Sequence, residues 1–130
     1  MNLNLRRADW VLLALAATRG ASLSPAQLQK TMFLVSRAVS AAAGVQLYEF
    51  ISSDYGTYDV AVFRDTEKLA DEGLVCVDRV GRRPVYAATD WGAIRAEAIA
   101  TQVPFALRQR VSTAAAWVRG LSFRELVNVV

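Results

Sequence analysis

Residues 48–89 read YEFISSDYGTYDVAVFRDTEKLADEGLVCVDRVGRRPVYAAT, and this stretch is the strongest indicator of the architecture. It begins as a strand. Asp59 can then cap a helix over Val60–Glu72, and Gly73 can end that helix. The segments LVCV and RRPVYAA have the pattern of two strands joined in a hairpin. The stretch therefore predicts a strand, a helix and a two-stranded wing, in that order.

Helices are predicted on both sides of this stretch. Leu5–Thr18 is apolar on most sides, and Ser24 with Gln27 forms a capping box that starts a helix ending at Gly44. After the wing, helices are expected from Thr89 or Asp90 to about Gln102, from Pro104 to Arg119, and from Ser122 to Val130. The order predicts a single, mainly α domain with a small β-hairpin: a winged-helix-like core over residues 1–89 and a helical extension over residues 90–130.

Charge is unevenly distributed, although the net charge is only +3. Residues 1–48 hold five basic side chains and one acid, residues 49–78 hold two and eight, and residues 79–130 hold eight and three. The basic ends could pair with the acidic middle or form a ligand patch. In the helix over Val60–Glu72, two basic side chains stand against four acidic ones, which is a poor surface for a phosphate backbone.

Composition argues against catalysis. With no histidine and one cysteine, Cys76, the chain lacks a histidine general base, an internal disulfide and a zinc-type ligand set. Asp54 and Asp59 could in principle hold a metal ion, but a turn residue and a helix N-cap explain them better. We therefore expect no enzyme activity, no cofactor and no metal. The core is expected to include Cys76, Tyr86, Trp91 and Trp117.

The loop before the helix over Val60–Glu72 is the best candidate for a protein-contact site. Tyr55 and Tyr58 flank Gly56 there, which offers exposed aromatic area and backbone N–H donors. Alternatively, Tyr58 packs on the helix and Tyr55 on the sheet, and the sequence leaves both possibilities open. Arg64 and Lys68 on the helix complete the predicted protein-contact set.

DNA binding is the alternative function. Arg79, Arg82 and Arg83 lie in or beside the predicted wing, where they could hold phosphates at the edge of a groove. Arg6 and Arg7 near the N-terminus could add further contacts. The wing arginines could instead solvate a tight turn or pair with the acidic helix beside it.

Four segments together resemble a known group of proteins. They are LQKTMFLVSRAV (28–39), YEFISSDYGTYDVAVFRDTEKLADEGLV (48–75), VYAATDWG (85–92) and WVRGLSFRELVNVV (117–130). These segments are similar to small bacterial and archaeal winged-helix-like proteins of the YwgA type and, more distantly, to the SocA-like antitoxin domain called Panacea. The resemblance implies a non-enzymatic module that acts by protein contact, in some relatives by neutralising a toxin. Relatives often carry Gly-Pro-Tyr where this chain has Gly56, Thr57 and Tyr58.

We therefore expect an antitoxin-like or adaptor-like interaction module with a protein partner. The apolar last helix could also pack on a second copy and form a homodimer. A single cysteine favours a reducing, cytoplasmic location. No apolar run approaches the ~20 residues that span a bilayer, and Trp10–Ala17 is better explained as a buried helix than as a targeting signal.

Overall fold

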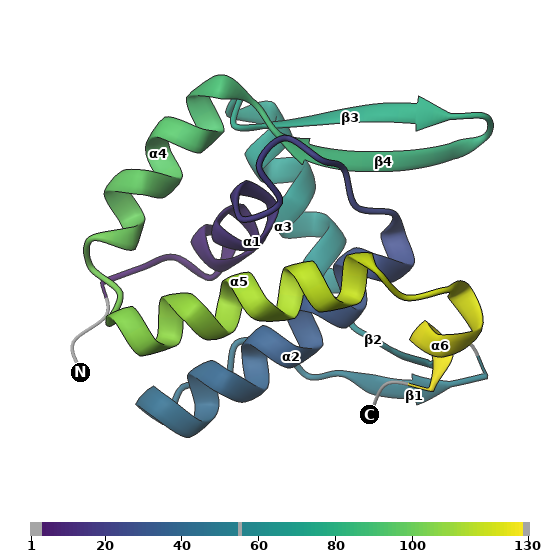
Figure 1. Cartoon of the computed structure of the whole chain (residues 1–130), viewed down its shortest axis with the longest axis horizontal. Helices are drawn as coiled ribbons and strands as arrows, with labels where there is room; N and C mark the ends of the chain where they lie inside the picture. The colour runs from purple at the N-terminus through teal and green to yellow at the C-terminus, as the bar shows by residue number, and fades with distance from the viewer. Residues whose placement is uncertain (1–3, 55, 129–130) are drawn as a thin grey trace.

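The computed structural model describes residues 4–54 and 56–128, and Figure 1 shows the arrangement of its helices and hairpins. The elements in chain order are α1 (Arg7–Ala16), α2 (Pro25–Ala43), β1 (Ile51–Ser53), β2 (Gly56–Tyr58), α3 (Val60–Asp71), β3 (Val75–Val80), β4 (Arg83–Ala88), α4 (Asp90–Ala100), α5 (Phe105–Arg119) and α6 (Phe123–Val127). Two separate antiparallel hairpins, β1–β2 and β3–β4, accompany the helices. The predicted mainly α fold with a small β part is confirmed.

Local capping signals set the starts of α2, α3 and α6 as predicted, whereas α1, α3 and α4 are one to four residues shorter than predicted. The Ser24 hydroxyl accepts a hydrogen bond from the Gln27 backbone N–H, the Gln27 side chain accepts one from the Ser24 N–H, and α2 starts there. Gly44 ends α2 in the left-handed region, at φ +68°. Asp59 caps α3 by accepting from the Ala61 N–H at 2.8 Å. A second capping box opens α6.

The core forms around α1, which contacts α2, α3, α4, α5 and β4 (Figure 1). Every residue from Ala8 to Leu15 is buried, which requires a helix that is apolar on nearly all sides. Side chains of α4 and α5 join the same core, so the predicted helical extension shares it with α1, α2 and α3. Among the described residues, no helix is both long and apolar enough to cross a membrane.

Gly92 allows α4 to cross closely over the loop that precedes β3. A Cβ atom at Gly92 would lie 1.9 Å from the backbone oxygen of Leu74 and 3.3 Å from a methyl group of Leu12. The same Leu74 oxygen accepts a hydrogen bond from the Thr89 N–H at 3.0 Å. The absent side chain therefore lets the helix and the loop come together.

The segment before α3 contains one strand more than predicted. Gly56–Tyr58 forms β2 and pairs with β1, so that Ile51 lies opposite Tyr58 and Ser53 opposite Gly56. Each strand is three residues long, which is too short for an alternating pattern to be recognised in the sequence. Tyr55 lies outside the described residues.

Three of the four predicted core residues, Cys76, Trp91 and Trp117, are exposed, whereas Tyr86 is partly buried and packs against the core. Cys76 is exposed because the burial of β3 ends at its first residue, Val75, and the rest of the strand lies in the hairpin that extends to one side of the molecule (Figure 1). Trp91 and Trp117 are 72% and 52% exposed, on the outer sides of α4 and α5. Tyr86 is only half-buried, with its ring 6.3 Å from that of Phe63. Aromatic character alone therefore did not identify the core.

Candidate protein-contact site

A surface pocket lies where α2, the β1–β2 hairpin, α3 and α6 meet, and we call it the α6 pocket. Its volume is about 450 Å³, within the range of small-ligand sites. The residues that line it include Lys30, Thr57, Tyr58, Phe63, Phe123 and Leu126. The pocket thus has mostly apolar walls and one charged group among the described residues that form it.

Lys30 supplies that charge from a buried position on α2. The side chain is 2% exposed, and its Nζ donates to Thr57 Oγ1 at 2.9 Å and to the Thr57 backbone oxygen at 3.4 Å. Burial lowers the pKa of the Lys30 ammonium. Within residues 4–54 and 56–128, no carboxylate oxygen lies within 4.0 Å of this group. The positive charge is therefore held by neutral oxygens alone.

Gly56 makes room for this ammonium. Its backbone adopts φ +100°, which side-chain-bearing residues rarely adopt, and an added Cβ would lie 2.4 Å from Lys30 Nζ. Gly56 and Tyr58, both predicted as protein contacts, line the α6 pocket. The structure thus brings two predicted residues together with Lys30, which lies about thirty positions earlier in the chain.

Exposed apolar side chains flank the α6 pocket. Phe123 on α6 is 58% exposed, and Ile51 on β1 is 55% exposed. Ile51 lies directly opposite Tyr58 in the hairpin, so the two side chains share a face. Sequence reasoning missed Lys30, Phe123 and Ile51 as site residues. Lys30 carried no signal because the segments that cover it are distant in the sequence.

Arg64 and Lys68, the other predicted protein contacts, lie on the exposed side of α3 and do not line the α6 pocket. Glu67 and Asp71 are exposed beside them. The outer face of α3 therefore carries both signs of charge, which corrects the expectation of an acidic surface. The reason is that the other two carboxylates of this region are bound by arginines from the N-terminal segment.

Arg7 pairs with Asp65, a buried residue of α3. Arg7 Nε donates to Asp65 Oδ2 at 2.7 Å and Arg7 Nη2 donates to Asp65 Oδ1 at 3.1 Å. The buried Tyr48 hydroxyl donates to the same carboxylate. Burial and this hydrogen bond raise the pKa of Tyr48. The carboxylate thus joins the start of α1, α3 and the segment before β1.

Arg6 pairs with two further carboxylates. Its Nη1 lies 2.9 Å from Glu72 Oε2, and its Nη2 lies 3.2 Å from Asp9 Oδ1. The hydrogen bond from Arg6 lowers the pKa of Glu72. Pairing of a basic end with the acidic middle of the chain is therefore confirmed. Arg6 and Arg7, predicted as contacts of the DNA-binding alternative, are already engaged within the fold.

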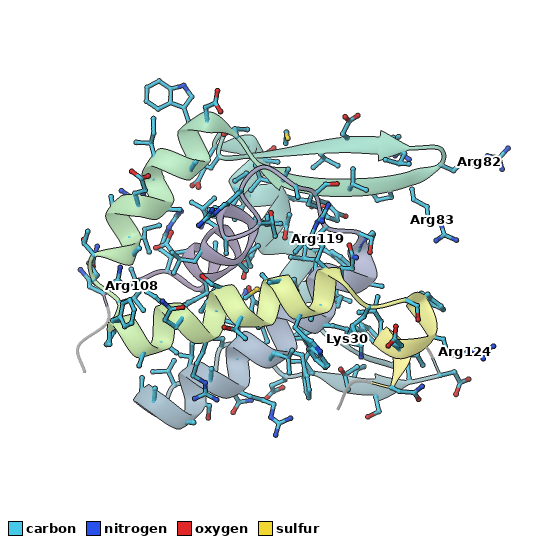
Figure 2. The ribbon with its side chains drawn as sticks, in the orientation of Figure 1. Lys30, Arg82, Arg83, Arg108, Arg119 and Arg124 are labelled. Atoms are coloured by element: carbon cyan, nitrogen blue, oxygen red, sulfur yellow. The ribbon has the colours of Figure 1, made fainter. Side chains whose placement is uncertain are left out.

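The wing arginines are arranged differently. Arg79 Nη1 donates to the backbone oxygen of Arg82 at 3.2 Å and so braces the turn of the hairpin. Figure 2 shows Arg82 and Arg83 at the free end of the hairpin, and Arg124 on α6 at the same side of the molecule. Arg124 was not predicted as a site residue. The tip of the β3–β4 hairpin and α6 thus both carry exposed guanidinium groups.

Among the described residues, no three His, Cys, Asp or Glu side chains form a group that could hold a metal ion. No protein-family model matches the sequence, and no curated protein matches it significantly. Function is therefore inferred from the residues and geometry of this chain.

Proposed function

We propose that the protein is a non-enzymatic, winged-helix-like interaction module, antitoxin-like or adaptor-like, whose protein partner docks at the α6 pocket. The observation that carries this proposal is the combination of an apolar pocket with exposed Phe123 and Ile51 beside it. Covering such side chains removes apolar surface from water, which favours association. Residues that fill or surround pockets of this kind contribute most of the binding free energy in many interfaces.

The mixed charge of the α3 outer face supports the same proposal. Arg64 and Lys68 stand beside Glu67 and Asp71, so this face offers no excess of positive charge to a phosphate backbone. A protein surface can match both signs of charge, which improves specificity and the rate of association. Arg64 and Lys68 stay predicted contacts at the periphery of the interface.

Replacing Phe123 with aspartate should weaken capture of the partner by roughly thirtyfold or more, because a carboxylate would enter the apolar centre of the interface. Wild-type and Phe123→Asp proteins are immobilised, exposed to host lysate, and compared by quantitative mass spectrometry. The partner that is lost is then purified and titrated by calorimetry. Capture of the chain itself would identify the predicted homodimer.

Trp117→Asp is the matched control, because Trp117 is 52% exposed and does not line the α6 pocket. This variant should retain the partner, and circular dichroism checks that both variants fold. If Trp117→Asp loses the partner while Phe123→Asp captures it fully, the interface lies outside the α6 pocket and the proposal is contradicted.

DNA binding is the second candidate, and one observation favours it. Arg82 and Arg83 are exposed at the tip of a projecting hairpin, and no carboxylate of the described residues lies within 4.0 Å of either. Guanidinium groups placed in this way suit phosphate contacts at a groove edge.

If DNA is the partner, changing Arg82 and Arg83 together to glutamate should abolish binding, and the wild-type affinity should fall steeply with added salt. An electrophoretic mobility shift at low salt with mixed duplexes measures both effects. Arg6→Ala serves as the control, since Arg6 is already bound to Glu72 and Asp9. Absence of any shift at low salt would remove this candidate.

A further inference from the structure

Among the described residues, no carboxylate compensates the positive charge that Lys30 places against the apolar walls of the α6 pocket. The ammonium of Lys30 has three N–H groups, and Thr57 accepts hydrogen bonds from two of them. Among the described residues, no other acceptor forms a hydrogen bond with Lys30, and no carboxylate pairs with it. A buried charge without an ionic partner is costly, so the two hydrogen bonds to Thr57 only partly offset the burial of Lys30 within the described residues.

A ligand carboxylate would provide the missing partner. A charge-assisted hydrogen bond between an ammonium and a carboxylate is stronger than the bonds that Lys30 makes to the neutral oxygens of Thr57. The walls formed by Phe63, Phe123 and Leu126 would at the same time receive an apolar group. The pocket therefore favours a ligand in which a carboxylate and an apolar group are only a few bonds apart.

We propose that the α6 pocket binds the C-terminal residue of the partner protein, with its terminal carboxylate at Lys30 and its apolar side chain against Phe63, Phe123 and Leu126. A chain that ends in leucine, valine or phenylalanine carries both groups on one residue, which suits a pocket of about 450 Å³. An internal aspartate or glutamate offers the carboxylate but no apolar group on the same residue. This inference rests on the proposed function, because it names the part of the partner that docks.

The test compares two peptides that differ only at the terminus. Acetyl-Gly-Gly-Leu-Phe with a free carboxylate, and the same peptide with a C-terminal amide, are titrated into the ¹⁵N-labelled full chain. The free acid should shift the backbone amide signals of Gly56 and Thr57, and calorimetry should show roughly thirtyfold weaker binding of the amide. This comparison uses the wild-type protein, so it does not depend on whether a variant folds.

Lys30→Met then tests the role of the ammonium. The variant should bind the free acid as weakly as it binds the amide, whereas Arg110→Met, which removes a positive charge from the exposed side of α5, should bind the acid like the wild type. Lys30→Met is expected to fold, because it replaces a buried charge by an apolar side chain of similar length. Failure of Lys30→Met to fold would contradict the argument that the lysine is unnecessary for the fold.

Several outcomes would overturn the inference. They are equal binding of acid and amide, binding of neither peptide, undiminished binding to Lys30→Met, and tighter binding of phenylacetate than of the peptide, which would indicate a small-molecule site. Failure of the proposed function is seen separately. If the peptide acid binds better than the amide but Phe123→Asp still captures the partner, the proposed docking surface is contradicted. If Phe123→Asp loses the partner but acid and amide bind equally, only the assignment of the carboxylate to Lys30 is contradicted.

Discussion

Replacing Gly92 with alanine is expected to lower the free energy of unfolding by about 3 kcal/mol, although alanine is intrinsically the better helix former. The new Cβ would lie 1.9 Å from the Leu74 backbone oxygen, well inside van der Waals contact. That oxygen also accepts a hydrogen bond from the Thr89 N–H, so relief requires the loop or the start of α4 to move. Equilibrium urea denaturation followed by circular dichroism measures the loss.

Gly120→Ala provides the matched control, at the C-terminal end of α5. Gly120 has an ordinary right-handed φ of −82°, and a Cβ there would meet only the Trp117 and Ala116 oxygens, at 3.5 and 3.9 Å. The substitution should change stability by less than about 1 kcal/mol. Equal losses in the two variants, or an unchanged Gly92→Ala protein, would show that the close approach of α4 to Leu74 is not what requires the glycine.

Replacing Asp65 with alanine is expected to lower the free energy of unfolding by about 2 kcal/mol. The Tyr48 hydroxyl, on a residue that is 5% exposed, would be left without its acceptor. Arg7 loses its partner too, but its side chain is 45% exposed and recovers contact with water, so it contributes less to the loss. Urea denaturation of Asp65→Ala, Tyr48→Phe and the double variant isolates the Tyr48–Asp65 coupling.

The control for this cycle is Asp71→Ala, an exposed acid of the same helix. Its effect should remain within about 0.5 kcal/mol, because surface substitutions away from special features rarely do more. Additive effects of Asp65→Ala and Tyr48→Phe would contradict the coupling. The hydrogen bond between the two side chains would then have no measurable part in stability.

Features encoded by neighbouring residues were predictable from the sequence. Each capping signal at Ser24, Asp59 and Ser122 requires only residues within three positions, and each is present in the structure. The β3–β4 hairpin could be recognised for the same reason, since its strands join through a short turn. The β1–β2 hairpin could not, because two three-residue strands are too short to show a pattern.

Features that depend on distant segments were harder to predict. Cys76 is exposed because only the first residue of β3, Val75, is buried, and alternation along β3 does not reveal how little of the strand the other elements cover. The burial of Lys30 follows from its cover by β2 and α6. Charge counting left open whether the basic ends pair with the acidic middle, and it could not identify Asp65 and Glu72 as the carboxylates that arginines more than fifty positions away bind. Of the predicted protein contacts that the structure describes, Gly56 and Tyr58 line the observed pocket, whereas Arg64 and Lys68 do not.

Because Lys30 lies against Gly56, the residues at these two distant positions constrain each other during evolution. Any residue with a Cβ at position 56 would collide with the lysine ammonium, and most would also strain the backbone at φ +100°. A lineage that abandons the glycine therefore requires the end of the side chain at position 30 to move aside or to become shorter. Covariation between these two positions across an aligned set of descendants would be the evolutionary record of that contact.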